Sequence, residues 1–303
     1  MLRSILLFAS AVLLALPLSA QRRVVAGPGG PQDGAPLPPI TSLSDEFDSP
    51  ASLGRWTSHA AAEGWPEMIR TMDAAGTAPG ALYLEPAVSG WYADFRGPFL
   101  FQEITGDFVA TTRVRARGTG GALPSVTWSL AGLMVREPRG TTAATWEPRA
   151  ENWLFATTGI AGQAGQPVIE TKTTVNGRSA LNLHPVPAGW MELRIVRVRA
   201  DFLLFARAEG AAEWTLQERF FRPDLPRTVQ VGVNAYSGWD LVPELWTDAA
   251  AFNRRVITDR PTDLAAEFDY VRFDRPRVPE PLRGVRLSDY RVPAADLVAA
   301  FGG

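Results

Sequence analysis

The amino-acid sequence predicts an all-β protein, a two-sheet antiparallel β-sandwich with one short helical insertion. Apolar and polar residues alternate with a period of two over much of the segment from about Thr41 to Asp274. Turn signals separate these runs roughly every 8 to 15 residues, as in a sandwich of short strands. No alternation of strands with helices is present, which argues against a parallel α/β fold.

The N-terminal segment, residues 1–20, has the pattern of a secretion signal. Arg3 supplies a positive charge, an apolar run extends from Ile5 to Leu16, and the small residue Ala20 ends the segment. The run is shorter than the ~20 apolar residues that a membrane span needs. We therefore expect cleavage near Ala20, no membrane span afterwards, and a secreted or periplasmic protein. The alternative of an uncleaved signal anchor is left open, because basic residues follow at positions 22 and 23.

Three further segments complete the predicted organisation. Residues 21–40 are rich in glycine and proline and predict a linker. The β-sandwich is expected over residues 41–274. The proline- and arginine-rich residues 275–303 predict a C-terminal tail that lies on or off the domain, with a short helix over Pro293–Phe301.

Within the sandwich, strands are predicted from short runs of alternating or β-branched residues. They cover Phe108–Arg117, Val126–Val135, Asn152–Thr158, Val168–Val175, Met191–Val198, Phe202–Ala206, Glu213–Phe220, Thr228–Ala235 and Ala266–Phe273.

Three local signals refine this picture. Asn176-Gly177 predicts a tight hairpin turn followed by another short strand. The alternation slips by one position after Ile195, which indicates either a bulge or a strand covered on both faces. Pro243–Val256 is the best helix candidate, with proline at its start and basic residues near its end.

Composition excludes several classes of function. A formal net charge of -2 gives no general attraction for nucleic acid. The absence of cysteine removes thiolate catalysis and cysteine-ligated zinc, and two histidines cannot form an imidazole-rich metal site. No Gly-x-Ser-x-Gly motif is present for a serine nucleophile.

Three segments resemble the strands of concanavalin A-like lectins and glucanases. Leu43–Asp48, followed by Leu53 and Arg55-Trp56, resembles the opening strand of that jelly roll. Ala131–Arg136 resembles a strand of secreted bacterial laminin-G-like domains and of the C-terminal module of family 43 β-xylosidases. Asp263–Phe273 resembles the closing strand, which pairs with the first. The resemblance implies a two-sheet jelly roll with a face that holds sugar, and it names no ligand.

The resemblance also implies where catalysis would be found. Family 16 glucanases of this fold carry Glu-x-Asp-x-Glu or Glu-x-Asp-x-x-Glu on one strand, which points the carboxylates into one cleft. In the nearest match, which starts at Glu267, Val271 and Arg272 occupy the positions of the second glutamate. The sequence therefore favours a protein that is not an enzyme of this type. A carboxylate pair assembled from distant strands stays open.

The candidate ligand-binding residues combine aromatic rings with polar neighbours, which suits sugars. They are Arg136, Asn152, Trp153, Tyr236 and Trp239. The last two lie in Asn-Ala-Tyr-Ser-Gly-Trp-Asp, residues 234–240, where a strand enters a long insertion. The alternative is that these aromatic residues only pack beneath the predicted helix.

Calcium is a further option that the resemblance implies, because related jelly rolls often hold a structural calcium ion between the first and last strands. Asp48 and Asp269, beside Asp45 and Glu46, are the oxygen donors at matching positions.

Taken together, these features favour a secreted or periplasmic, non-catalytic domain that binds or adheres to a polysaccharide or another glycan. A glycoside hydrolase with an unrecognised carboxylate pair, and a structural protein-interaction domain without a sugar ligand, are the alternatives.

Overall fold

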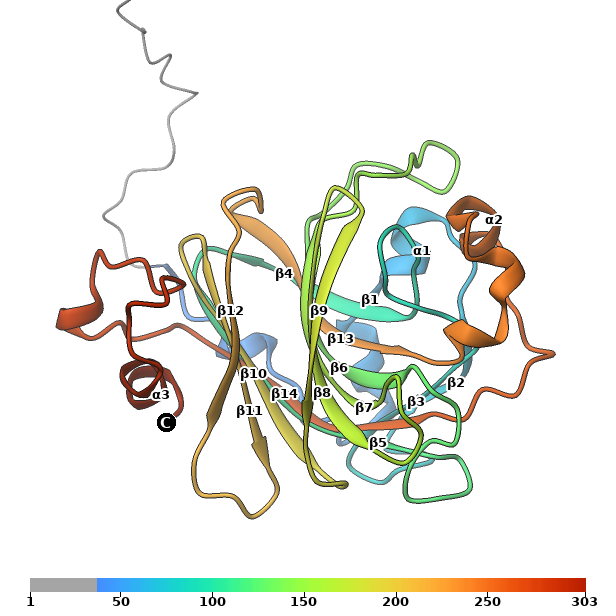
Figure 1. Ribbon diagram of the computed structural model, residues 1–303, viewed down its shortest axis with the longest axis horizontal. Helices are drawn as coiled ribbons and strands as arrows, with labels where there is room; N and C mark the ends of the chain where they lie inside the picture. Colours follow the sequence, from blue (N-terminus) through green and yellow to red (C-terminus); the bar gives the residue numbers. More distant parts are fainter. Residues whose placement is uncertain (1–36) are drawn as a thin grey trace, which may run out of the picture. The chain divides into compact units, whose positions relative to one another are not determined.

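The computed structural model describes residues 37–303. The predicted signal peptide and nearly all of the predicted linker lie outside the described residues. The described chain forms two seven-stranded sheets with antiparallel pairing between neighbouring strands, and only short helical segments interrupt it (Figure 1). The predicted two-sheet β-sandwich is therefore confirmed.

The strands are β1 (Thr57–Ser58), β2 (Ile69–Ala74), β3 (Leu82–Pro86), β4 (Phe99–Thr105), β5 (Phe108–Arg117), β6 (Ser129–Arg136), β7 (Trp153–Ile160), β8 (Pro167–Val175), β9 (Arg178–Pro185), β10 (Met191–Val198), β11 (Asp201–Ala208), β12 (Thr215–Phe221), β13 (Thr228–Tyr236) and β14 (Ala265–Asp274). The helical segments are η1 (Thr41–Leu43), η2 (Pro50–Arg55), α1 (His59–Glu63), η3 (Trp239–Leu241), η4 (Pro243–Leu245), α2 (Ala249–Asn253), η5 (Glu280–Leu282) and α3 (Ala294–Phe301).

The order of strands brings distant parts of the chain together. The first sheet has the order β1-β4-β13-β6-β7-β8-β9, and the second has the order β12-β11-β10-β5-β14-β3-β2. The predicted pairing of the opening and closing segments is present, since Asp45 forms an antiparallel bridge with Val271 of β14. The last strand therefore lies inside the second sheet, between β5 and β3.

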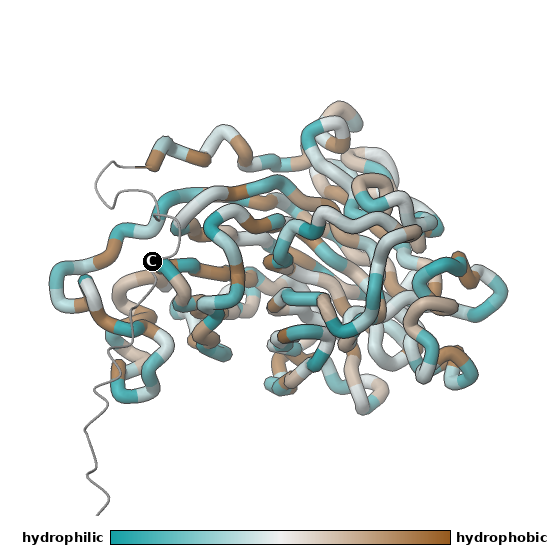
Figure 2. The backbone as a smooth tube through the Cα atoms, turned by 90° about the horizontal axis from the view of Figure 1, so that it is seen from above, coloured by the Kyte–Doolittle hydropathy of each residue, from teal (hydrophilic) through white to brown (hydrophobic). Residues whose placement is uncertain are grey.

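The core lies between the two sheets and follows from the alternation of side chains along each strand. Leu133 and Val135 of β6 and Leu154 of β7 face this core. Their neighbours Met134 and Phe155 point to the outer face of the first sheet and join a second, aromatic-rich cluster there. Hydropathy accordingly changes from residue to residue along the strands (Figure 2).

The C-terminal residues lie on the domain. Leu297 and Phe301 of α3 pack in one cluster with Val196 of β10 and Phe205 of β11 on the outer face of the second sheet, and Figure 1 shows α3 beside these strands. Strand β10 pairs with β5 and β11 without a register shift. The slip in alternation after Ile195 thus marks a strand covered on both faces.

The insertion after β13 is less helical than predicted. The expected helix over Pro243–Val256 is wrong in extent, because the structure has the short turn η4 and then α2. Asp248 restarts the helix as its N-cap, and its side chain accepts a hydrogen bond from the backbone N–H of Ala251. The segment then ends after a single further turn. The predicted terminal helix, by contrast, is confirmed as α3.

The predicted hairpin at Asn176-Gly177 is confirmed, since these two residues join the paired strands β8 and β9. Both have positive φ angles, 48° and 66°, as a two-residue turn of this kind requires. A Cβ at Gly177 would lie 2.4 Å from Oδ1 of Asp94, so only glycine fits here without displacing its neighbours.

Across residues 37–303, none of the helices has the length and apolar character that crossing a membrane would need.

Candidate functional site

An aromatic pocket opens on the outer face of the first sheet. Its volume is about 300 Å³. The residues that line this aromatic pocket are Gly90, Trp91, Tyr92, Trp128, Lys172, Leu181, Tyr236, Trp239, Asp240 and Trp246.

Strands supply the floor of the pocket and loops supply its walls. Lys172 lies in β8, and Tyr236 is the last residue of β13. Trp239 and Trp246 come from the insertion after β13. Gly90 permits the close approach of this insertion to the loop before β4, since a Cβ there would lie 3.1 Å from the Trp239 ring.

A buried charged cluster forms the base of the aromatic pocket. The Lys172 ammonium lies 2.7 Å from Oε1 of Glu170 and donates to the carbonyl oxygen of Trp91 at 2.8 Å. Oε2 of Glu170 accepts a hydrogen bond from the Tyr236 hydroxyl. Burial lowers the pKa of Lys172, against the opposing charge of Glu170. Burial and the neighbouring Glu170 carboxylate raise the pKa of Tyr236 well above its ordinary value.

Aromatic rings surround this ammonium group. The Lys172 nitrogen lies between 5.1 and 5.9 Å from the ring centroids of Tyr92, Trp128, Phe155 and Tyr236. These distances are within the range of cation–π attraction. The cluster is therefore held by one carboxylate, one carbonyl and several ring faces.

The rim of the aromatic pocket is open to solvent. Tyr92 is 44% exposed and Trp246 is 46% exposed. The Trp246 ring stacks on Trp239 with a centroid separation of 6.1 Å, and its Nε1 donates to the Trp239 carbonyl oxygen at 3.0 Å. These contacts hold an exposed ring in a fixed orientation, which suits the stacking of a flat ligand face.

The structure brings together two of the five predicted ligand-binding residues. Tyr236 and Trp239 both line the aromatic pocket. Trp153 is completely buried, stacked on Phe155 at 5.3 Å and packed against the edge of Trp91 at 5.8 Å. Its ring is therefore closed to a ligand in this conformation.

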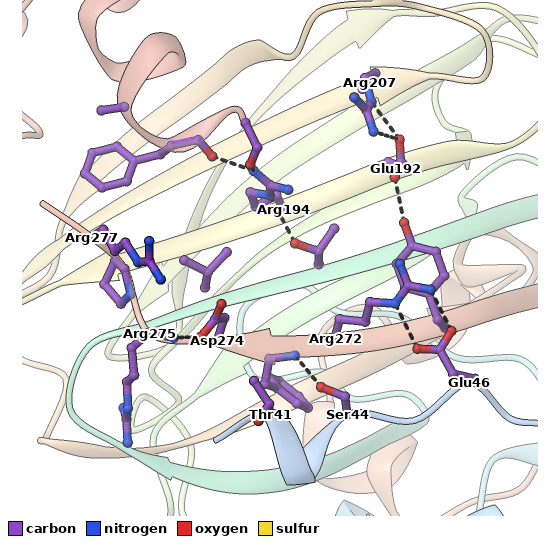
Figure 3. Close-up of a pocket in the computed structure, with 18 residues that line it drawn as sticks. Thr41, Ser44, Glu46, Glu192, Arg194, Arg207, Arg272, Asp274, Arg275 and Arg277 are labelled. Carbon is purple, nitrogen blue, oxygen red and sulfur yellow. Dashed lines mark hydrogen bonds and ion pairs between the residues drawn. The ribbon is translucent and has the colours of Figure 1, made fainter. Parts of the chain in front are cut away.

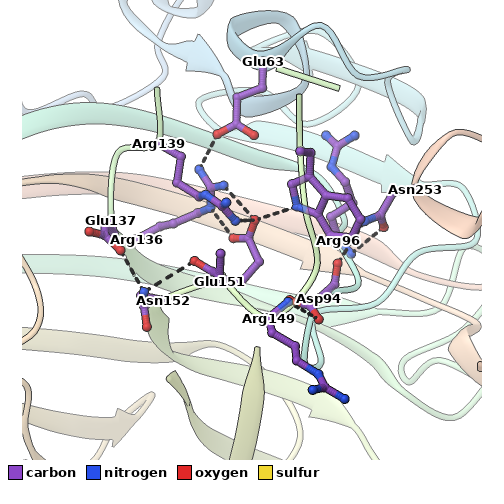
Figure 4. A network of polar contacts seen from close by, with 12 residues as sticks. Glu63, Asp94, Arg96, Arg136, Glu137, Arg139, Arg149, Glu151, Asn152 and Asn253 are labelled. Atoms are coloured by element: carbon purple, nitrogen blue, oxygen red, sulfur yellow. Dashed lines mark hydrogen bonds and ion pairs between the residues drawn. The ribbon is translucent and has the colours of Figure 1, made fainter. Parts of the chain in front are cut away.

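The other two predicted residues lie in a separate polar network (Figure 4). Arg136 is completely buried. Its guanidinium contacts Glu63 at 2.7 Å, Glu151 at 3.0 and 3.2 Å, and Gln230 at 3.1 Å. Asn152 lies beside the network and donates to Glu137 at 2.8 Å.

Both carboxylates of this Arg136 network are fully engaged. Besides Arg136, Glu63 accepts from Trp65 at 3.1 Å, and Glu151 accepts from Arg139 at 2.9 Å and Trp146 at 3.2 Å. Burial alone would raise the pKa of Glu151, but the charge and hydrogen bonds of Arg136, helped by the charge of Arg139, lower it. No oxygen remains to attack or protonate a substrate, so this arrangement fastens α1 and the loop after β6 onto the first sheet.

His59 belongs to the same network and is a buried neutral histidine. Its Nε2 lies 3.0 Å from Oε2 of Glu63, and its Nδ1 faces Arg96 at 3.4 Å. Burial, together with the positive charges of Arg136 and Arg96, lowers the pKa of His59 from 6.5 to about 4, although the hydrogen bond to Glu63 opposes the shift.

This shift predicts a loss of stability in mild acid. Because the unfolded chain binds the proton first, the contribution of His59 is complete above pH 6.5 and falls as the pH drops toward 4. The free energy of unfolding is expected to fall by up to about 1.4 kcal/mol for each pH unit in this range. Urea unfolding at several pH values between 7.5 and 5 measures it. In His59→Gln, which does not titrate, the slope over this range is expected to disappear; an unchanged slope would assign it to other groups.

Sequence reasoning did not name most of the lining residues as ligand-binding, among them Tyr92, Trp128, Lys172 and Trp246, and it included Asp240 only as part of the stretch 234–240. One signal was present: Lys172 is the single lysine of the chain and lies two positions from Glu170 in a β-branched strand. Residues two apart share a face of a strand. A lysine and a glutamate on one face of an otherwise apolar sheet indicate a paired, buried site.

A larger groove lies on the outer face of the second sheet, beside the C-terminal segment (Figure 3). Its volume is about 690 Å³, and five arginines line it. Arg207 pairs with Glu192 and Arg272 pairs with Glu46, the latter at 2.8 Å. Arg194 donates to the carbonyl oxygens of Phe301 and Gly303.

In the same groove, Arg275 donates to the carbonyl oxygens of Pro38, Thr105 and Asp107. Three of its five arginines, namely Arg194, Arg272 and Arg275, therefore hold the end segments of the described chain against the sheet. The groove offers polar contacts, but it lacks the open aromatic faces of the aromatic pocket.

The described residues do not fit a calcium site built on the predicted donors. Both oxygens of Asp45 accept hydrogen bonds, from Phe47, Ser52 and Trp56. Glu46 pairs with Arg272 and Asp269 with Arg113.

Asp48 is exposed. In the described part of the chain, three or more histidine, aspartate or glutamate side chains nowhere gather to hold a metal ion.

Comparison with known proteins gives the fold. No family model matches the sequence, and no curated protein matches it. Among solved structures, a functionally unknown protein from Saccharomyces cerevisiae is similar, with a TM-score of 0.50 and 19% identity over 75% of this chain and 99% of that chain.

The GH43 protein BlXynB from Bacillus licheniformis is also similar, with a TM-score of 0.51 and 16% identity over 78% of this chain. The match covers 40% of the BlXynB chain. At these identities the likeness concerns the fold. This chain has the concanavalin A-like β-sandwich fold that the sequence resemblance implied.

Proposed function

We propose that this protein is a non-catalytic carbohydrate-binding domain, secreted or periplasmic, whose ligand occupies the aromatic pocket. One observation carries the proposal: the exposed rings of Tyr92 and Trp246 surround a cavity whose floor contains the buried ammonium of Lys172. Sugars present C–H faces that stack on such rings and hydroxyls that need polar partners.

The size of the aromatic pocket supports a small ligand. Ligand cavities usually measure roughly 300–1,000 Å³, and this one measures about 300 Å³, which is room for one or two sugar rings. The similarity in fold to a protein named as a GH43 protein agrees with a carbohydrate-related role.

The chemistry of the aromatic pocket favours binding over hydrolysis. A glycoside hydrolase usually needs two carboxylates, one on each side of the scissile bond. Glu170 is fully buried, and both its oxygens are engaged by Lys172 and Tyr236. Asp240 is the only carboxylate among the residues that line the pocket. We therefore assign the pocket to recognition.

The first experiment is a glycan-array screen of the chain from residue 21, with calcium and with chelator. We expect saturable binding to a defined glycan that chelation leaves unchanged. Replacing Trp246 with alanine removes an exposed stacking face and is expected to weaken binding at least tenfold, or about 1.4 kcal/mol. Fluorescence titration with the glycan measures the affinity, and thermal unfolding confirms the fold.

Tyr290→Ala is the matched control, because Tyr290 is 77% exposed and lies in the C-terminal segment. It should bind like the parent protein. Absence of binding to any glycan by a folded protein would move the assignment to a protein-interaction domain. Cleavage of a labelled oligosaccharide would move it to a hydrolase.

A further inference from the structure

We infer that the aromatic pocket takes the uncharged terminal residue of a glycan, held between Lys172 as hydrogen-bond donor and Asp240 as acceptor. This inference rests on the proposed function and adds to it the class of sugar and the part of the glycan that is bound.

The donor is Lys172. An ammonium group has three N–H donors. One N–H donates to the carbonyl oxygen of Trp91 at 2.8 Å, and the Glu170 carboxylate pairs with the ammonium group at 2.7 Å. At least one N–H therefore remains for a ligand, in a residue that lines the aromatic pocket and is only 2% exposed. A donor fixed in this way loses little freedom when a hydroxyl binds it.

The acceptor is Asp240, from the segment that also carries Trp239. Oδ2 of Asp240 accepts a hydrogen bond from Thr127. Oδ1 is shielded from solvent and has no hydrogen-bond partner among residues 37–303. A sugar hydroxyl donates to such an oxygen, while its neighbour accepts from Lys172, so that a pair of adjacent hydroxyls satisfies both groups.

The charges of the aromatic pocket favour an uncharged sugar. The positive charge of Lys172 is already paired with Glu170, which leaves the carboxylate of Asp240 as the excess charge. A uronic acid would bring a second carboxylate close to it, and like charges repel strongly in a partly buried site. The aromatic pocket therefore discriminates against acidic sugars.

The surroundings of the aromatic pocket favour binding of the end of a glycan. Elsewhere on the same face of the first sheet, Arg136, Trp153 and Phe99 are buried. The Arg136 network and the packed rings Trp65 and Trp146 cover that part of the face. A polysaccharide running across the sheet would have to displace these contacts, whereas a terminal residue enters the aromatic pocket from solvent.

The test compares neutral and acidic ligands of increasing length by tryptophan fluorescence at low salt. The probes are methyl glycosides of glucose, galactose, mannose and xylose, the methyl glycosides of glucuronic and galacturonic acid, and oligomers of the neutral sugar that binds. We expect the neutral glycoside to bind at least tenfold more tightly than its uronic acid. Affinity should change less than threefold between the trimer and the hexamer.

Asp240→Asn separates charge from shape. It keeps an oxygen acceptor and is expected to narrow the preference for the neutral sugar to below threefold, with unchanged thermal unfolding. Affinity that rises steadily from trimer to hexamer, or equal binding of the uronic acid, would overturn this inference while the proposed function stands. If none of these sugars and no arrayed glycan binds, both are overturned.

Discussion

Replacing Arg136 with methionine is expected to lower the free energy of unfolding by about 3–5 kcal/mol, the usual effect of removing one partner of a buried ion pair. Arg136 is completely buried, and its guanidinium contacts the carboxylates of both Glu63 and Glu151. Without it, two buried carboxylates lose their main positive partner. Urea unfolding measures the change, and the melting temperature should fall by roughly 10 °C.

The control is Arg283→Met. Arg283 pairs with Glu280 on the surface, where the two side chains are 67% and 81% exposed, and such pairs contribute at most about 1 kcal/mol. A second variant tests whether the lost stability comes from unpaired charge. Arg136→Met combined with Glu151→Gln removes one of the two buried carboxylates that have lost their partner, and it should regain part of the free energy of unfolding. Equal stability of Arg136→Met and the parent protein would contradict the assignment of this network as a structural fastening.

Lys172→Met should cost about 3 kcal/mol, toward the lower end of the range for a broken buried pair. The pair is almost inaccessible, with 2% of Lys172 and none of Glu170 exposed. The loss is smaller than for Arg136 because Glu170 keeps its hydrogen bond from Tyr236. Urea unfolding at pH 7 measures the loss.

The double variant Lys172→Met/Glu170→Gln separates charge from packing. It removes both charges while keeping similar volume, and it should regain at least half of the stability lost in Lys172→Met. If the double variant is no more stable than the single one, the lysine acts through packing against the surrounding rings instead of through its charge.

The alternation of apolar and polar residues was enough to predict the sandwich and most of its strands. It failed for the first four strands, β1 to β4. Strand β3 has four of its five residues buried, because both of its faces are covered, and shows no period of two. A strand that is buried on both faces has no alternating pattern of apolar and polar residues. The turn residues beside β3 did not mark its ends either.

The candidate site was only partly predictable for a similar reason. Tyr236 and Trp239 follow each other closely in a loop rich in polar and aromatic residues, so the local sequence indicated a binding region. Trp153 and Arg136 are on the outer face of the first sheet as well, but segments distant in sequence cover them: the loop before β4 packs Trp91 on Trp153, and α1 supplies Glu63 to Arg136. Contacts between segments distant in sequence determine which part of the outer face of the sheet stays exposed to solvent. A local sequence pattern does not show such contacts.

The central position of β14 has a consequence for biosynthesis. The ribosome makes the chain from its N-terminus, so β5 and its other neighbour in the sheet, β10, leave the exit tunnel before residues 265–274. Until then β5 has a free edge of ten residues, and β3 lacks the strand that joins it to the sheet. Unpaired edges of this length recruit other strands. The second sheet can therefore close only after nearly nine-tenths of the chain has been translated, when its last strand is available.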